Sequence, residues 1–189
     1  MTVAEWLKGE GAHHDLVEWA SAHGDDWDAL WRACPRGDWL LGIAARRGVD
    51  RRALVEAACA CAALAFDHLP EAETRPQAAV EAARAWVAGA DDEAARARAS
   101  ADVDAAIEGA PDPAVAAAAT AALACLGAID DPSEAATAAA SAIHAAALDA
   151  VDCGLGSAVR YAQAETADRV RAVFPAPPSD QSDAVQSNG

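Results

Sequence analysis

Two helices joined by one short turn form the most constraining feature of this sequence, and they occupy residues 51–89. In the first helix, apolar residues recur at spacings of three and four, which places them on one side of a 3.6-residue spiral. These residues are Leu54, Ala58, Cys61, Ala62, Ala65 and Leu69. Pro70 marks the end of the helix, because proline does not continue the helical hydrogen-bond pattern.

The second helix of the pair is punctuated at both ends. Thr74 is expected to cap it while Gln77, three residues later, reaches back to the cap. Pro76 occupies the first turn, where its missing N–H costs little, and Gly89 closes the helix. Trp86 lies near that end and is predicted to be a core residue.

The second helix also carries the motif RPxxAxEAARAWxxG at residues 75–89. Its fixed positions are Arg75, Pro76, Ala79, Glu81, Ala82, Ala83, Arg84, Ala85, Trp86 and Gly89. With cysteines on the preceding alanine-rich helix and further alanine-rich helices after the motif, residues 51–173 resemble the small bacterial immunity proteins of the Imm-5-like group. The resemblance implies a protein that binds and neutralises a toxin.

The sequence beyond residue 89 predicts further helices and no strands. Aspartates and glycines recur where helices begin and end. The expected helices run from the cap Asp91 to about Glu108, from Asp112 to Gly127, from Asp131 to near Gly154, and from Ser157 to Val173. Alanine dominates these helices; it has the best helix propensity but buries little area, so each helix needs neighbours.

Large aromatic side chains gather in the N-terminal part of the sequence. Five of the six tryptophans lie in the first 39 residues, and they are expected to fill a common core. The predicted fold class is all-α, an alanine-rich antiparallel helix bundle or short α-solenoid of about seven to nine helices. Residues 1–174 are expected to form a single helical domain, Trp-rich over 1–50 and alanine-rich over 51–174. Residues 175–189 are expected to form a disordered tail.

The chain is strongly acidic, with 30 acidic and 14 basic residues and a formal net charge of −16. A field of this sign repels nucleic acid and anionic membranes and attracts a basic protein partner. A second interpretation stays open, in which the acidity maintains solubility or reflects a salt-adapted or GC-rich source. No apolar stretch is long enough to span a membrane and no signal-peptide pattern is visible, so the sequence predicts a cytoplasmic protein.

The five cysteines are Cys34, Cys59, Cys61, Cys125 and Cys153. An odd number, largely inside apolar helical patterns, favours buried free thiols in a reducing compartment. Cys59 and Cys61 together with His68 suggest a metal site, but residues two apart on a helix point about 200° apart and no second pair of ligands exists. The sequence therefore predicts no metal and no cofactor.

A dense basic cluster brackets the turn at residues 48–50, and two further arginines belong to the motif. The candidate binding residues are Arg46, Arg47, Arg51, Arg52, Arg75 and Arg84. Arginine forks can hold a phosphate or a partner's carboxylate. The alternative is pairing within the fold, with Asp38, Asp50, Glu56 or Glu81 as partners. His13 and His14 beside Asp15 are expected on an exposed surface, with an acid–base site as the alternative, and no catalytic residue is predicted.

These features together predict a non-enzymatic helical binding protein. The resemblance implies an immunity protein that neutralises a toxin by direct binding, and the net charge favours a basic toxin domain as the partner. The alternative is a structural or scaffolding helical subunit, or an adaptor, of a larger bacterial assembly. Self-association into a homo-oligomer would suit that alternative. An enzyme would need a pocket with convergent polar groups, which alanine-rich helices supply poorly.

Overall fold

The structure, a computed structural model, describes residues 1–150 and 155–178, and over these residues it contains only helices and their connections. This confirms the all-α prediction. The described part holds ten α-helices and one 3₁₀ helix: α1 (Val3–Gly9), α2 (His14–His23), α3 (Trp27–Ala33), α4 (Gly37–Arg46), α5 (Arg51–Ala62), η1 (Ala63–His68), α6 (Arg75–Val87), α7 (Glu93–Glu108), α8 (Pro113–Gly127), α9 (Glu134–Asp149) and α10 (Leu155–Val173).

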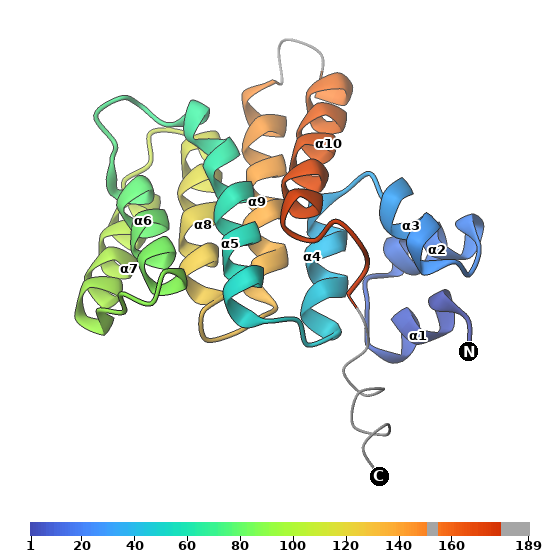
Figure 1. The fold of residues 1–189 in the computed structure, drawn as a ribbon. Helices are drawn as coiled ribbons and strands as arrows, with labels where there is room; N and C mark the ends of the chain where they lie inside the picture. Colours follow the sequence, from blue (N-terminus) through green and yellow to red (C-terminus); the bar gives the residue numbers. More distant parts are fainter. Residues whose placement is uncertain (151–154, 179–189) are drawn as a thin grey trace.

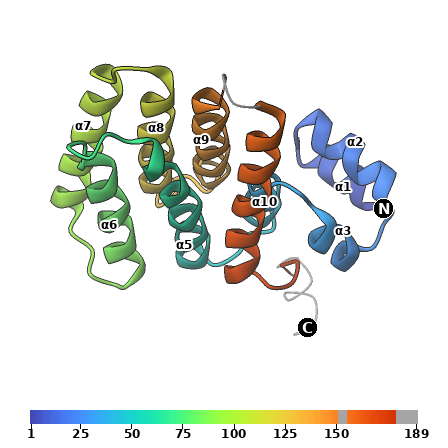
Figure 2. The same cartoon turned by 90° about the horizontal axis from the view of Figure 1, so that it is seen from above.

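Most of the helices pack in two layers (Figure 1). Figure 2 shows α7, α8 and α9 side by side in one layer and α6, α5 and α10 in the other. Helix α4 packs against α9 and α10, and α1 to α3 lie at that end of the molecule. Because α5 contacts α8, α9 and α10 as well as its chain neighbour α6, the arrangement is a bundle. In a solenoid, each repeat contacts only the repeats next to it in sequence.

Helix α5 lies at the centre of the bundle. Asp50 caps it by accepting a hydrogen bond from the N–H of Ala53 (3.0 Å). The predicted apolar stripe is buried as far as Ala65, and residues on the other sides of α5 are buried as well. The α-helix ends at Ala62 and the chain continues as a 3₁₀ helix to His68. The most constraining segment of the sequence thus becomes the helix at the middle of the packing.

Alanine lets α8 and α9 pack together along much of their length, and both helices bury alanines on several sides. Each alanine removes little apolar area from water, so the stability of this layer is a sum of many small contacts. Among the described helices, none combines the length and the apolarity needed to cross a membrane.

The start of α7 differs by one residue from the prediction. Asp92 caps the helix by accepting a hydrogen bond from the N–H of Ala95 (2.9 Å). Asp91, the predicted cap, instead pairs with Arg96, whose Nε lies 2.8 Å from its Oδ1. Two adjacent aspartates offered the same capping chemistry, and the fold gives each a separate role.

The predicted capping box at α6 does not form. Thr74 precedes the helix, but its side chain accepts no capping hydrogen bond. Glu73 supplies the acceptor instead, because its Oε1 accepts a hydrogen bond from the N–H of Arg75 (3.1 Å). The same carboxylate pairs with the Arg75 guanidinium, with 2.8 Å between Nε and Oε1.

The last two helices also differ from the prediction at their junction. Helix α9 ends at Asp149, and its predicted end near Gly154 lies outside the described residues. Helix α10 begins at Leu155, so Ser157 lies inside the first turn rather than capping it. The predicted end at Val173 is confirmed.

The five tryptophans of residues 1–39 do not all enter the core. Trp31 is buried, with 1% of its surface exposed, whereas the other four are half-buried. Trp6 and Trp27 meet edge to face with 5.3 Å between ring centroids, and the guanidinium of Arg47 lies 3.8 Å from the Trp27 centroid. Of the expected common core, only the Trp31 indole is therefore buried. The other four tryptophans form an outer layer, and the guanidinium of Arg47 covers part of it.

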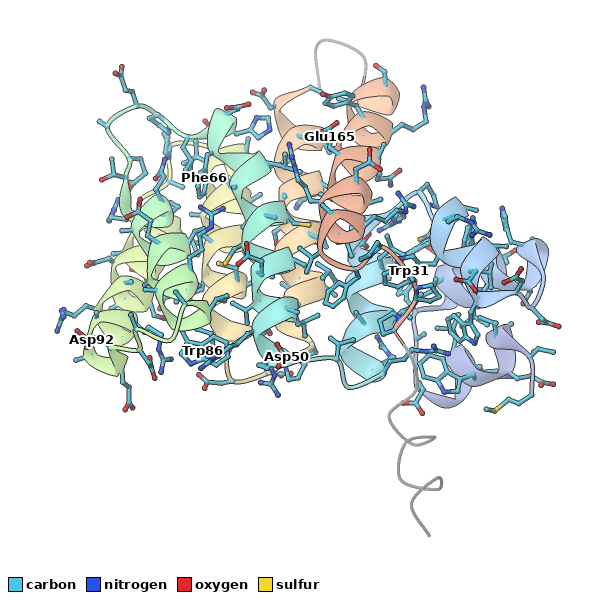
Figure 3. All side chains as sticks on the ribbon, in the orientation of Figure 1. Trp31, Asp50, Phe66, Trp86, Asp92 and Glu165 are labelled. Atoms are coloured by element: carbon cyan, nitrogen blue, oxygen red, sulfur yellow. The ribbon has the colours of Figure 1, made fainter. Side chains whose placement is uncertain are left out.

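Trp86 is likewise half-buried rather than a full core residue. It lies in the last turn of α6, at the lower edge of the molecule in Figure 3, and Arg52 lies over its ring at 5.9 Å from the centroid. The helix ends one residue later, and Gly89 adopts φ +86°, a left-handed conformation that favours glycine. The motif position of Gly89 thus marks a structural turn.

The chain after α10 lies against the N-terminal helices. The carbonyl of Phe174 accepts a hydrogen bond from Trp31 Nε1 (2.9 Å), and the carbonyl of Pro178 accepts one from Arg47. Pro177 and Pro178 are half-buried. Pro177 and Pro178, which the sequence placed in a disordered tail, therefore pack on the body, whereas Pro175 and Ala176 are exposed. The predicted tail over 179–189 lies outside the described residues.

Two truncations test this boundary. Deleting residues 179–189 should change the melting temperature by less than about 2 °C, because this polar segment has no apolar pattern to bury. Deleting residues 175–189 also removes the acceptor of the Arg47 hydrogen bond and should cost about 2 kcal/mol, or about 4 to 8 °C. Thermal unfolding followed by circular dichroism compares the two. Equal melting temperatures would show that the packing of residues 175–178 contributes nothing.

Candidate functional site

A groove of about 580 Å³ lies between α7, α8 and α9. Its apolar and hydroxyl-bearing lining includes Leu123 and Thr120 of α8, Thr137 of α9 and Ser100 of α7. Leu123, Thr120 and Ser100 are half-buried and Thr137 is exposed, so all four side chains are accessible from solvent. The volume of the groove lies within the range of ligand-binding pockets in proteins, which is about 300 to 1,000 Å³.

Carboxylates surround one end of the groove. Glu93 comes from the first turn of α7, Asp130 and Asp131 from the α8–α9 connection, and Glu134 from the first turn of α9. Asp91, outside the lining, pairs with Arg96, the one cation among the described lining residues. Asp91 thus offsets the charge of Arg96, and the four lining carboxylates leave the groove with an excess of negative charge.

Asp131 is held in its ionised form. Its Oδ1 accepts hydrogen bonds from the backbone N–H of Ser133 (2.9 Å) and from the Ser133 hydroxyl (2.8 Å). These hydrogen bonds, the backbone one first, lower the pKa of Asp131 below its ordinary value, and the charge of Arg51 acts in the same direction. Asp131 therefore stays negative across the neutral pH range.

The helices bring these carboxylates together through two close contacts. A Cβ on Gly127 would lie 3.2 Å from Cγ of Glu134, so the glycine leaves room for the glutamate over the end of α8. Arg51 reaches across from α5 and donates from Nη1 to the carbonyls of Ile129 (2.7 Å) and Asp130 (3.0 Å). Arg51, predicted to bind a partner, thus acts as a positioning residue for the acidic connection.

Arg46 and Arg47 lie at the opposite end of α4 from the buried Gly37. The guanidinium of Arg46 donates to the carbonyls of Gly42 (2.9 Å) and Glu10 (3.1 Å), which joins α4 to the end of α1. Arg47 is half-buried against the tryptophans described above. Both residues act inside the fold, through carbonyls and rings rather than through the carboxylates that the sequence suggested.

The remaining predicted arginines are dispersed. Arg52 covers the ring of Trp86, and Arg75 pairs with Glu73 at the start of α6. Arg84 is exposed on α6, away from the Glu73–Arg75 pair at the other end of the same helix. The six arginines predicted as a binding set therefore do not converge on one site.

The histidine pair near the N-terminus is exposed. His13 caps α2, because its Nδ1 accepts a hydrogen bond from the N–H of Asp15 (3.3 Å). His14 lies 3.8 Å from Glu18, one turn further along the same helix. The two rings contact different residues. His13 acts as a helix cap, and His14 forms a surface pair with Glu18.

The described cysteines are free and buried. The Sγ of Cys59 lies 4.0 Å from the carbonyl of Val80 on α6, whereas the Sγ of Cys61 lies 3.6 Å from the carbonyl of Thr166 on α10. The two thiols thus diverge, as their spacing predicts. In the ranges 1–150 and 155–178, no three His, Cys, Asp or Glu side chains are grouped to hold a metal ion. Cys153 lies outside these ranges.

Burial controls the chemistry of these thiols. It raises the pKa of Cys34 to about 11 and that of Cys61 to about 12. A hydrogen bond with Cys59, together with burial, raises the pKa of Cys125. Since folding favours the protonated thiols, stability falls as the pH rises above the unfolded thiol pKa of about 8.5.

A thiol titration tests this arrangement. In a Cys153→Ser background, Ellman's reagent at about pH 8 should modify less than about one tenth of an equivalent in the native protein, because the thiolate fraction and access are both low. The unfolded protein in guanidinium chloride provides the control and should release every thiol. Rapid modification of the native protein would contradict the burial of the four cysteines.

The sequence did not single out the groove. It used Asp131 only as the signal of a helix start and did not select Glu93, Asp130 or Glu134 as binding residues. The available signal was the acidic run at 130–134 shortly after Gly127. What was missing was the position of α7, whose first turn supplies the opposite side of the groove.

Comparison with known proteins gives no direct guide to what the groove binds. No family model, no curated protein and no solved structure matches this chain. The immunity-protein resemblance stays an expectation from the motif.

Proposed function

We propose that this chain is a non-enzymatic binding protein that receives a basic segment of a protein partner in the groove between α7, α8 and α9. The observation that carries the proposal is the set of four carboxylates around an open groove in which the one described lining cation is already paired. Arginine or lysine side chains of the partner would meet Glu93, Asp130, Asp131 and Glu134. The apolar stems of those side chains would lie on Leu123 and the threonines.

The charge of the whole chain supports the same partner. A net charge of −16 attracts a basic protein at long range and speeds its association in a salt-dependent way. The groove alone is smaller than a stable protein interface, which buries about 1,200 to 2,000 Å² in total. Exposed residues of α7 and α9 beside the groove would supply the remaining area.

We further propose that the partner is a toxin and that binding neutralises it, because residues 51–173 resemble immunity proteins that act in this way. Many intracellular toxins act on polyanions and carry basic surfaces, which an acidic groove would cover. The proposal places the protein in the cytoplasm, since free thiols suit a reducing compartment.

A charge-matched comparison tests the groove. The groove variant carries Asp130→Asn, Asp131→Asn and Glu134→Gln, which keep the side-chain shapes. The control variant carries Glu56→Gln, Asp104→Asn and Glu108→Gln, three exposed carboxylates outside the groove, and has the same net charge. The probe is a fluorescein-labelled peptide of alternating arginine and alanine, and its binding is followed by fluorescence anisotropy.

The groove variant should bind the arginine peptide about tenfold more weakly, and the control variant within about twofold of the unmodified chain. Equal weakening in both variants would show that only net charge attracts the peptide, and would reject the groove. The toxin assignment is tested separately, by expressing the product of the neighbouring gene alone and together with this chain. Growth arrest by that product, relieved by this chain, supports it; continued growth without this chain contradicts it.

A further inference from the structure

A second cavity, of about 450 Å³, lies between η1, α9 and α10. Its apolar walls consist of alanines four residues apart on two helices, together with Leu64 of η1. The alanines are Ala142, Ala146 and Ala150 at α9 and Ala158 and Ala162 on α10. Residues four apart lie on the same side of a helix, so each helix lines the cavity with short side chains. The space between them remains open because these short side chains do not fill it.

Polar groups line the same cavity. His68 of η1 and Asp149 of α9 meet across it, with 3.3 Å between Nδ1 and Oδ2. The imidazole is mostly buried, with 16% of its side chain exposed, so this contact fixes the orientation of the ring. The cavity is therefore lined by an imidazole that is held against a carboxylate.

The charges of the cavity are unbalanced. Asp67, Asp149 and Glu165 contribute three carboxylates to its described lining, against the one guanidinium of Arg169. Arg169 pairs with Glu165, one turn away on α10, with 3.6 Å between Nη2 and Oε2. Figure 3 labels Glu165 in the upper part of this helix. Two carboxylates are left in excess, and a cation in the cavity would be stabilised.

An aromatic ring completes the cavity lining. Tyr161 of α10 is 70% exposed, although aromatic side chains usually bury most of their surface. The face of an aromatic ring attracts a cation, so the Tyr161 ring adds to the attraction that the carboxylates exert on an ammonium group. Tyr161 also lies outside the hydrophobic core that the described residues form, so core packing does not account for a ring at this position.

From these contacts we propose that the cavity binds a small organic amine with a short apolar body. The ammonium group lies among the carboxylates of Asp67 and Asp149 and the ring of Tyr161. The apolar body lies between the alanines of α9 and α10. None of these residues lines the acidic groove, so the site goes beyond the proposed function and stands or fails independently of it.

Benzylamine is a suitable probe, because it combines an ammonium group with an apolar body that fits the volume. Titrated into the ¹⁵N-labelled full chain, it should shift amide signals of α9, η1 and α10 with a dissociation constant of about 1 mM, as expected for a ligand of this size. Benzyl alcohol, the neutral analogue, should bind at least about tenfold more weakly, because it lacks the charge.

Three variants locate the site. Asp149→Asn should weaken benzylamine binding about fivefold, Tyr161→Ala about threefold, and Ala146→Leu should abolish binding by filling the cavity. Because the leucine could also disturb the packing of α9, the exposed Tyr161 provides a variant that keeps the fold. Asp104→Asn on α7 is the charge-matched control for Asp149→Asn and should leave binding unchanged.

Three results would overturn the proposal. Equal binding of benzylamine and benzyl alcohol would remove the claim that the site recognises a cation. Benzylamine binding that Asp149→Asn and Tyr161→Ala leave unchanged would place the amine outside this cavity, and undetectable binding at about 10 mM would show that the cavity binds no such amine.

Discussion

The Trp31→Ala variant is expected to lose about 3 to 5 kcal/mol of unfolding free energy, the range for emptying a buried site of a large aromatic residue. Trp31 has the largest of the fully buried side chains in the described part of the chain. Its indole lies between α3 and the segment after α10, as Figure 3 shows, and its Nε1 donates to the carbonyl of Phe174 (2.9 Å). Removing it loosens the packing between the two ends of the chain.

Two further variants divide this loss into its parts. Trp31→Phe keeps an apolar ring but leaves the Phe174 carbonyl without its donor, and should cost about 1 to 3 kcal/mol. Trp19→Ala removes a half-buried indole from the same region and should cost less than Trp31→Ala, because its site is already open to water. Urea denaturation measures all three, and a Trp31→Ala loss below that of Trp19→Ala would contradict the assignment of Trp31 as the buried anchor.

The Gly37→Ala variant is expected to lose about 3 kcal/mol, through overpacking rather than through a cavity. A Cβ at Gly37 would lie 2.6 Å from the backbone carbonyl carbon and from Cβ of Thr166 on α10. The glycine N–H also donates to the Thr166 hydroxyl oxygen at 3.3 Å. Because the clash involves backbone atoms, no side-chain rotation relieves it, and α4 must move away from α10.

Gly9→Ala is the matched control. A methyl group added at Gly9, the last residue of α1, would have no heavy atom within 4 Å, and the backbone φ of Gly9 is not positive. The same substitution there should therefore change stability by less than about 1 kcal/mol. Urea denaturation of the two variants gives the difference directly. If both variants were equally stable, the close approach of α4 and α10 at Gly37 would be wrong.

The helices themselves could be predicted because their signals are local. The cap Asp112 and the following Pro113 start α8 as predicted, and Asp112 Oδ1 accepts hydrogen bonds from the N–H groups of Ala114 (2.9 Å) and Val115 (3.0 Å). Such a signal requires only residues within one turn. Asp91 and Asp92 offer the same local capping signal at the start of α7. Because Asp91 pairs with Arg96, Asp92 is the residue that caps the helix.

The partners of the arginines were not local. Arg51 donates to carbonyls 78 and 79 residues away, and Arg47 donates to one 131 residues away. A sequence shows nearby carboxylates as the natural partners of a guanidinium, but a backbone carbonyl carries no sequence signature. Since every residue offers the same carbonyl acceptor, only the folded chain selects which one an arginine meets.

The sequence by itself determined the helical class, several helix boundaries such as the start of α8 and the end of α10, and the buried stripe of α5, because hydrogen bonds and periodicity within one turn specify them. Only the tertiary structure decided that four carboxylates from α7, α9 and the connection before α9 share one groove, and that η1, α9 and α10 enclose a second cavity. Alanine-rich surfaces have little shape to specify a partner, so the neighbours of each helix depend on the fit of the whole bundle.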